Sequence, residues 1–210
     1  MRISISLATL ILAAVLQPNT AHAQQTGQPG QFDYYLLTLS WSPEFCYSHR
    51  SAAECSQHLG FIVHGLWPQF NDGSYPQHCS NQPGLSDPSK VADIMPDPSL
   101  VEHEWSTHGT CSGLGPDQYF GLIEQDFHSV QIPAALNNPT RSATMRPSQI
   151  KQAFVQANSG LSASGIAVTC RGGYLTGIEI AMSKDGQPIA FPTPTREDCR
   201  SSTIRIPPIR

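Results

Sequence analysis

Positive charge is scarce in the first two thirds of this sequence. Residues 24–140 contain two basic residues against twelve acidic ones, whereas residues 141–210 contain nine basic residues against four acidic ones. The full sequence has a net charge of −4, so it lacks the basic field that a general polyanion binder usually carries. If the partner is a polyanion, we expect the C-terminal third to supply most of the attraction.

Long hydrophobic runs are absent beyond the first residues. The apolar run over residues 3–16 has 14 residues, whereas a membrane-spanning helix needs about 20. This run follows Arg2 and precedes Ala21, His22 and Ala23, an order typical of a cleaved secretory signal peptide. We therefore expect a signal peptide over residues 1–23 and no membrane partner. Residues 24–210 are expected to form one secreted or periplasmic domain that acts as a monomer.

Spacings that bind metals are also missing. The six cysteines form no C-x-x-C pair, and His103 and His108 lie at i, i+5 rather than at the i, i+4 spacing of zinc peptidases. An even number of cysteines behind an export signal instead indicates disulfides, although their spacing alone leaves the pairing open. We expect no metal and no cofactor.

The hydrophobic pattern predicts an α+β domain. Short apolar and β-branched segments predict strands over 34–41, 61–63, 165–170 and 174–182, which would form an antiparallel sheet. Helices are predicted over 99–108, 117–127 and 148–157, the first from a capping-box pattern that begins at Ser99. Helices that pack against one antiparallel sheet define the α+β class.

The helix over 99–108 turns two ionisable groups toward the expected core. Glu104 and His108 fall on its apolar stripe, whereas His103 and Thr107 are neighbours on its flank. Burying ionisable groups costs several kcal/mol unless they are paired. We therefore interpret Glu104 and His108 as functional residues.

A second candidate is His64, which follows the predicted strand over 61–63. Gly65 comes directly after it, so we expect His64 at the end of the strand, where the chain turns sharply. A lone histidine in this position is more often structural. Together with the helical His-Glu unit, however, His64 supplies the second group that general acid–base catalysis needs.

Two segments resemble the active-site segments of a known family. FIVHGLWPQ (residues 61–69) and HEWSTHGTC (residues 103–111) are similar to those of the ribonuclease T2 family, and LSWSPEFC (residues 39–46) extends the similarity. The resemblance implies the family's disulfide-stabilised α+β fold. It also implies disulfides Cys79–Cys111 and Cys170–Cys199, which leaves Cys46 and Cys55 for a local bridge.

The same resemblance implies a metal-independent endoribonuclease that acts on single-stranded RNA. The RNA supplies its 2′-hydroxyl as the nucleophile, His108 matches the base, His64 matches the acid, and Glu104 completes the catalytic set. Cleavage then gives a 2′,3′-cyclic phosphate and finally a 3′-phosphate, the chemistry of a lyase followed by a hydrolase. DNA lacks the 2′-hydroxyl and should not be cleaved.

Further positions match the family's phosphate and base sites. His103 and Thr107 fall in the phosphate-binding segment. Trp67 and Tyr75 match positions that stack on a nucleobase, although core packing is an equal alternative for Trp67. Gln69 stands where some relatives use an acid to read the base.

Thr107 departs from the family pattern, which has a lysine at this position. That lysine neutralises the charge that develops on phosphorus, whereas a threonine donates one hydrogen bond and no charge. We expect protonated His103 or an arginine of the C-terminal third to fill this role in part. The alternatives are a catalytically weakened RNA-binding or defence protein on the same fold, and a metal-dependent hydrolase.

Overall fold

The computed structural model describes residues 27–193 and 198–210. The signal peptide predicted over residues 1–23 lies outside this part of the chain. Among the described residues, no helix is long and apolar enough to cross a membrane.

An open six-stranded sheet forms the centre of the fold. Its strands run in the order β2-β1-β5-β6-β3, with β4 paired to β5. All pairs are antiparallel except β5 and β6, which run parallel where Tyr174 meets Arg205. The strands are β1 (Tyr34–Trp41), β2 (Phe61–Gln69), β3 (Ala143–Met145), β4 (Ile166–Arg171), β5 (Tyr174–Met182) and β6 (Ile204–Ile206).

The predicted strands are confirmed with one correction to their length. The strand predicted over 61–63 continues through Gly65 and Pro68 to Gln69. A proline lacks a backbone N–H, so it is tolerated in an edge strand such as β2 but not in the middle of a sheet. The short strands β3 and β6 were not predicted.

The three predicted helices are also confirmed, with bounds within two residues. The helices are α1 (Ser42–Ser48), α2 (Pro98–Thr107), α3 (Pro116–Ser129), α4 (Ala134–Asn137) and α5 (Pro147–Ala157), with 3-10 turns at Ala53–Ser56, Pro88–Val91 and Gly109–Cys111. The capping box predicted at Ser99 is wrong. The N-cap of α2 is Asp97, whose carboxylate accepts hydrogen bonds from the Ser99 backbone N–H and hydroxyl at 2.9 and 2.7 Å, because Pro98 already occupies the first helical position.

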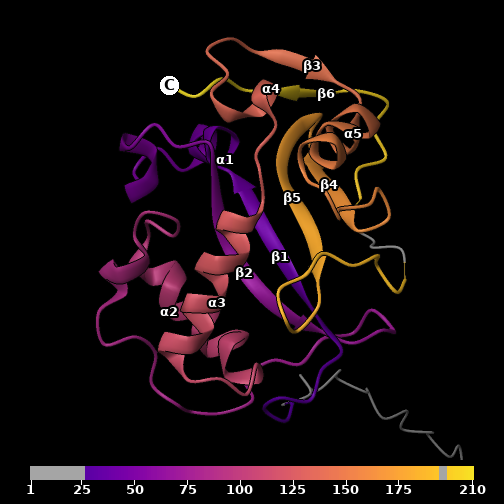
Figure 1. Ribbon diagram of the computed structural model, residues 1–210. Helices are drawn as coiled ribbons and strands as arrows, with labels where there is room; N and C mark the ends of the chain where they lie inside the picture. The colour runs from indigo at the N-terminus through magenta and orange to yellow at the C-terminus, as the bar shows by residue number, and fades with distance from the viewer. Residues whose placement is uncertain (1–26, 194–197) are drawn as a thin grey trace, which may run out of the picture.

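The helices cover one face of the sheet and leave part of the other face open. Figure 1 shows α2 and α3 beside β1 and β2, while α5 lies beside β4 at the other end of the molecule. On β1, Leu37 and Leu39 are fully buried in the core. The alternate residues Tyr34 and Leu36 point the other way and line a cavity, as the two-residue period of a strand requires.

All three disulfides implied by the resemblance are present, namely Cys46–Cys55, Cys79–Cys111 and Cys170–Cys199. Cys79–Cys111 joins two segments 32 residues apart in sequence. It fastens the loop that ends at Cys79 to the turn that follows α2.

Candidate active site

His64 projects from a β-bulge in the middle of β2. Thr38 of β1 pairs with Gly65 and the next residue, Leu39, pairs with Val63, so His64 is the extra residue of β2. A bulge locally increases the twist of a strand and re-aims a side chain. The expectation that His64 ends its strand is therefore wrong. The Oγ of Ser40 lies 3.1 Å from Nδ1 of His64 and fixes the orientation of the ring.

Gly65 is required for space rather than for a turn. A Cβ atom built at this position would collide with the carboxylate of Glu104 and with the indole nitrogen of Trp67. The backbone of β2 can therefore approach the buried carboxylate only where the side chain is absent.

Helix α2 carries the other two catalytic candidates toward the core, as predicted. Glu104 is 1% exposed and His108, which caps the C-terminus of α2, is 7% exposed. The backbone N–H of His108 donates to the Glu104 carbonyl at 3.0 Å. The two side chains are thus fixed relative to each other by helical geometry.

Trp67 joins the strand residues to the helix residues. Its Nε1 donates a 2.6 Å hydrogen bond to Oε2 of Glu104. Its ring packs edge-on against His64, with centroids 5.5 Å apart, and stacks on His108 at 5.1 Å. The other Glu104 oxygen, Oε1, lies 3.4 Å from Nε2 of His64. Two imidazoles and one carboxylate therefore surround a single indole.

Burial shifts all three ionisable groups toward their neutral forms. Desolvation, with smaller contributions from the nearby histidines His103, His64 and His78, lowers the pKa of His108 to about 3. Desolvation also lowers the pKa of His64, with a contribution from His103. It raises the pKa of Glu104 to about 8, against the opposing effect of the Trp67 hydrogen bond. Burial therefore disfavours the charged forms of all three groups in this site.

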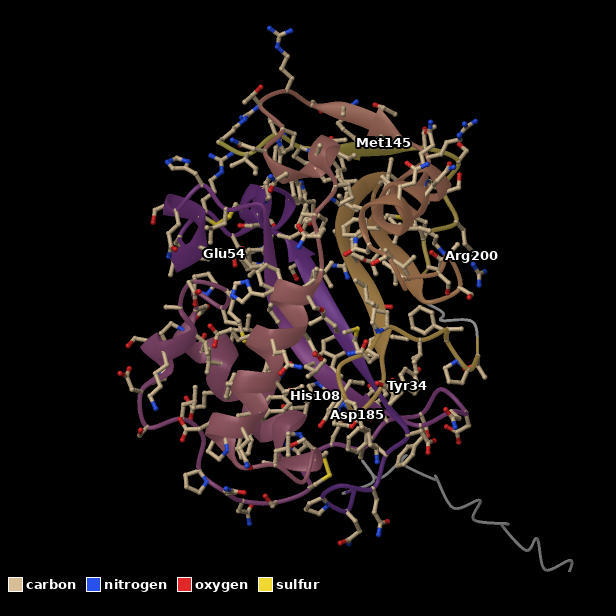
Figure 2. All side chains as sticks on the ribbon, viewed as in Figure 1. Tyr34, Glu54, His108, Met145, Asp185 and Arg200 are labelled. Atoms are coloured by element: carbon tan, nitrogen blue, oxygen red, sulfur yellow. A yellow bond between two sulfur atoms is a disulfide. The ribbon has the colours of Figure 1, made fainter. Side chains whose placement is uncertain are left out.

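A cavity of about 820 Å³ opens beside His108. Its wall brings together the three residues predicted to bind a base: Trp67, Gln69 and Tyr75. Gln69 is 7% exposed, and Tyr75 is 50% exposed with its ring centroid 6.3 Å from that of His108. Figure 2 shows Tyr34, which also lines the cavity, at the same end of the molecule as His108.

The sequence of this chain matches a family model over the region that contains all of these residues. The model is that of the Ribonuclease T2 family, and it matches residues 32–199. This chain belongs to the ribonuclease T2 family. The resemblance of the two active-site segments is thereby confirmed.

Individual members of the family are similar to this chain in sequence or in fold. A ribonuclease from Aeromonas hydrophila is 38% identical over 143 residues, which cover 66% of this chain and 65% of the relative, just under two thirds of its length. The structure of an RNase-related protein from Calystegia sepium has a TM-score of 0.69 at 22% identity and covers 84% of this chain and 97% of its own. The structure of RNase NT in complex with 5′-AMP has a TM-score of 0.68 at 24% identity. The match covers 84% of this chain and 98% of RNase NT. The two structures show a shared fold.

The segment that departs from the ribonuclease T2 pattern has an unusual environment. Thr107 is 4% exposed, and its Oγ1 is buried without a hydrogen-bond partner among the described residues. His103, one turn earlier, is exposed and acts electrostatically on both His64 and His108. No lysine or arginine of the described residues lines the cavity beside His108. Arg196 lies outside them, so the prediction of a compensating arginine stays a prediction.

Sequence reasoning missed two polar neighbours of this site. Ser40 orients His64, but only the register of β1 against β2 reveals the contact. His78 lies close enough to His108 to affect its pKa, although the two residues are 30 positions apart in sequence. The segment 39–46 that contains Ser40 indicates no role for this residue, and His78 belongs to no recognisable motif.

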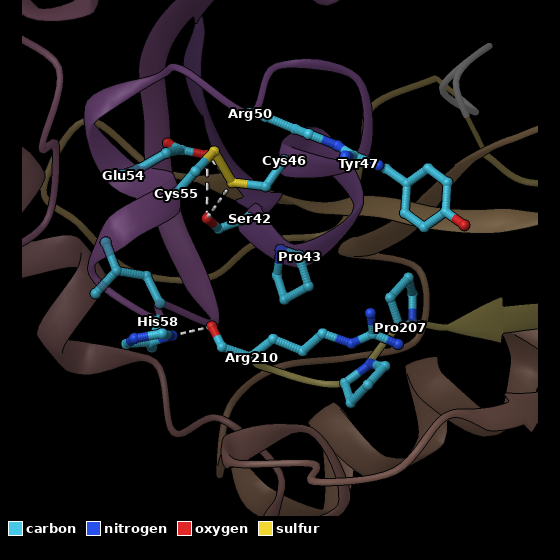
Figure 3. A pocket seen from close by; sticks show the side chains of 12 residues that line it. Ser42, Pro43, Cys46, Tyr47, Arg50, Glu54, Cys55, His58, Pro207 and Arg210 are labelled. Carbon is cyan, nitrogen blue, oxygen red and sulfur yellow. Dashed lines mark hydrogen bonds between the residues drawn. A yellow bond between two sulfur atoms is a disulfide. The ribbon is translucent and has the colours of Figure 1, made fainter.

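A second cavity, of about 390 Å³, lies between α1 and residues 207–210. Figure 3 shows Ser42 at its centre, where the hydroxyl donates to Oε1 of Glu54 at 3.1 Å, beside the Cys46–Cys55 disulfide. Neither His64 nor His108 lines this cavity. Its wall does not offer the acid–base pair of the first site.

Proposed function

We propose that this protein is an endoribonuclease that cleaves single-stranded RNA, with His108 as general base and His64 as general acid. The observation that carries the proposal is the arrangement of His64, Glu104 and His108 around Trp67. Membership of the ribonuclease T2 family supports the same reaction.

The first step requires no enzymic nucleophile. His108 takes the proton of the 2′-hydroxyl, O2′ forms a bond to phosphorus, and the bond from phosphorus to O5′ breaks. Imidazolium His64 gives its proton to the departing O5′, which leaves a 2′,3′-cyclic phosphate. In the second step water attacks the cyclic phosphate, the two histidines exchange roles, and a 3′-phosphate forms.

The lowered pKa of His108 suits the role of base, whereas the role of His64 as acid depends on its contact with Glu104. A base must be neutral, and the lowered pKa of His108 keeps it neutral in acidic solution. An acid must be protonated, and Glu104 supports this form of His64, because Oε1 lies 3.4 Å from Nε2 and can form an ion pair with the imidazolium. The two imidazoles are thus distinguished by their surroundings rather than by their residue type.

The phosphate and the base occupy neighbouring parts of this site. We assign the phosphate to the side of His103 and Thr107, although the buried hydroxyl of Thr107 would have to become accessible to contact it. The base enters the cavity of about 820 Å³, where Trp67 and Tyr75 offer stacking surfaces and Gln69 offers both a donor and an acceptor.

Every step uses protein side chains alone, so we propose that the reaction needs no metal and no cofactor. Two groups of described side chains are close enough to hold a metal ion, Cys46 with Glu54 and Cys55, and Asp93 with Glu124 and His128. Neither group includes a residue of the site, and the first contains a disulfide.

The predicted signal peptide and the disulfides both bear on the compartment in which the protein acts. Three disulfides form and persist in oxidising compartments. Together with the signal peptide predicted over residues 1–23, they support a secreted or periplasmic enzyme. We expect it to act as a monomer on RNA and to leave DNA intact.

A second candidate is a catalytically weakened RNA-binding or defence protein. It is favoured by Thr107, because the family pattern has a lysine where this chain has an uncharged residue. The two candidates differ in turnover, not in binding.

One assay separates these functions. The mature protein is incubated with single-stranded RNA and with DNA of the same sequence in excess EDTA, between about pH 5 and 7, the range in which imidazoles titrate. We expect 2′,3′-cyclic ends from RNA alone, lost in His64→Ala and His108→Ala and kept in His49→Ala, an exposed histidine outside the site. Binding without cleavage would support the weakened protein, and inhibition by EDTA would support a metal-dependent hydrolase.

A further inference from the structure

The departure at Thr107 leaves the phosphate site without its expected positive charge. The side chain of Thr107 is short, uncharged and buried, and its hydroxyl has no hydrogen-bond partner in the part of the chain that the structure describes. The last turn of α2 must still satisfy its free carbonyl groups. His78 binds two of these carbonyl groups, and its imidazole can carry a positive charge.

His78 binds the end of α2 at two points. Its backbone N–H donates to the carbonyl of Thr107 at 2.9 Å, and its ring Nδ1 lies 3.2 Å from the carbonyl of Ser106. A carbonyl only accepts, so Nδ1 carries a proton in this contact. Histidine side chains are known partners of the last carbonyls of a helix.

The backbone of His78 is held in this position from both sides. Its φ of +50° is unusual for a residue other than glycine, and the next residue, Cys79, is joined to Cys111 just beyond α2. The loop that leads to it lines the cavity through Tyr75 and Gln77. His78 is therefore held in a fixed position directly after the residues of this loop that line the cavity, and its side chain is exposed.

The other ring nitrogen of His78, Nε2, forms no hydrogen bond with any described residue. Because Nδ1 donates to Ser106, protonation places a second N–H on Nε2, and this group is available to an acceptor outside the protein. Hydrogen bonds between a charged donor and a phosphate oxygen are short and about twice as strong as neutral ones.

We propose that imidazolium His78 donates a hydrogen bond to the RNA phosphate and replaces the lysine that the family pattern has at position 107. This inference rests on the proposed endoribonuclease function. It adds a catalytic residue that comes from the loop before Cys79 rather than from α2. The effect of His78 on the pKa of His108 is consistent with a position beside the reacting groups.

The alternative is that His78 only caps the helix. Asparagine separates the two roles, because it tolerates a positive φ and its amide can donate to the carbonyl of Ser106. His78→Asn therefore keeps the cap and the backbone and removes the charge. His128→Asn is the matched control, since His128 is an exposed histidine on α3 outside the site.

The test is a double-mutant cycle between positions 78 and 107, measured as kcat/KM on a single-stranded RNA at about pH 5. We expect His78→Asn to lower kcat/KM at least about tenfold with an unchanged Tm, because it removes one charged donor to the charge that develops on phosphorus. Thr107→Lys should raise activity about tenfold in the His78→Asn background and less than about threefold in the wild type, because the two cations serve one phosphate.

A second measurement does not depend on a lysine at a buried position or on turnover. Inorganic phosphate is titrated into the wild type and His78→Asn by calorimetry, and we expect the variant to bind it about fivefold more weakly. The proposal is overturned if His78→Asn stays within twofold of the wild type in both kcat/KM and phosphate binding. It is also overturned if the variant loses activity and Tm together and Thr107→Lys restores neither.

The two proposals fail in different ways. A wild-type protein that does not cleave RNA contradicts the endoribonuclease, and phosphate binding then still tests His78. A wild-type protein that cleaves RNA while His78→Asn cleaves equally well contradicts only the role of His78.

Discussion

The indole of Trp67 donates a 2.6 Å hydrogen bond to the buried carboxylate of Glu104. This contact joins β2 to α2 across the site and leaves the other carboxylate oxygen facing His64. A buried carboxyl group without hydrogen bonds is costly, so the indole both stabilises Glu104 and sets its direction. Trp67 thereby acts on His64 through Glu104, in addition to its predicted contact with a base.

Removing only the indole N–H should slow the reaction. We expect Trp67→Phe to lower kcat about tenfold, because the loss of a buried hydrogen bond to an ionisable group costs about 1.5–3 kcal/mol and frees Glu104 to turn away from His64. The matched control is Trp105→Phe, since Trp105 is also buried and its Nε1 donates to the backbone carbonyl of Gln82 at 2.7 Å. Steady-state kinetics and thermal unfolding of both variants check the prediction. Equal kcat values in the two variants would contradict a role for the Glu104 contact.

Adding one methyl group at Gly65 should separate the strand from the helix. The new Cβ would overlap the Glu104 carboxylate and the Trp67 nitrogen, and such overpacking typically costs about 1–3 kcal/mol. We expect Gly65→Ala to lower kcat at least about tenfold, with a lowered Tm, as kinetics and calorimetry can measure. Gly121→Ala, at a helical position with open space around it, should raise Tm slightly and leave kcat unchanged. A fully active Gly65→Ala would show that the site tolerates a wider separation.

The helical half of the site could be predicted from the sequence, and the strand half only in part. The 3.6-residue period puts Glu104 and His108 on the buried side of α2 wherever the helix lies. The direction of His64 depends on a bulge, and a bulge is set by the register of β2 against β1, which the sequence of β2 does not encode by itself. The sequence therefore singles out Gly65 as the site of a turn, whereas in the structure it leaves space for the Glu104 carboxylate.

Contacts between distant segments account for the other differences. His78 lies 28 residues before its partner Ser106, and only the folded chain brings the loop before Cys79 to the end of α2. Ser-x-x-Glu is a common cap and predicts that α2 starts at Ser99, whereas the observed N-cap is Asp97, two residues earlier, followed by Pro98. Short strands such as β3 carry too few residues to show a period.

The pH dependence of cleavage should reflect the separated pKa values of the two histidines. The base must be neutral, and since the pKa of His108 is lowered to about 3, kcat/KM should fall on the acidic side only below about pH 4. The acid must be protonated, and since the pKa of His64 is lowered from 6.5, the alkaline decline should begin below that value. A profile of kcat/KM from about pH 3 to 8 checks both limbs. An acidic limb near pH 6.5 would mean that His108 is not the buried base.

Asp126 gives a prediction about stability rather than catalysis. This residue of α3 is fully buried, and neither carboxylate oxygen has a hydrogen-bond partner among the described residues. Burial raises the pKa of its side chain from 3.8 to about 7. Between these values the folded protein binds a proton that the unfolded chain has released, so the free energy of unfolding should fall as pH rises through this window.

The measurement is urea unfolding at about pH 4.5 and pH 8, with the disulfides intact. One pKa unit corresponds to about 1.4 kcal/mol, so a shift of this size sets an upper limit of about 4 kcal/mol on the loss. We expect Asp126→Asn to remove most of this pH dependence, because an amide does not ionise. Other shifted groups such as Glu104 remain in both proteins and cancel in the difference. The control is Asp185→Asn, at an exposed carboxylate in the turn after β5, which should leave the pH dependence of the free energy of unfolding unchanged. If Asp126→Asn also left this pH dependence unchanged, Asp126 would be ionised in the folded protein at both pH values.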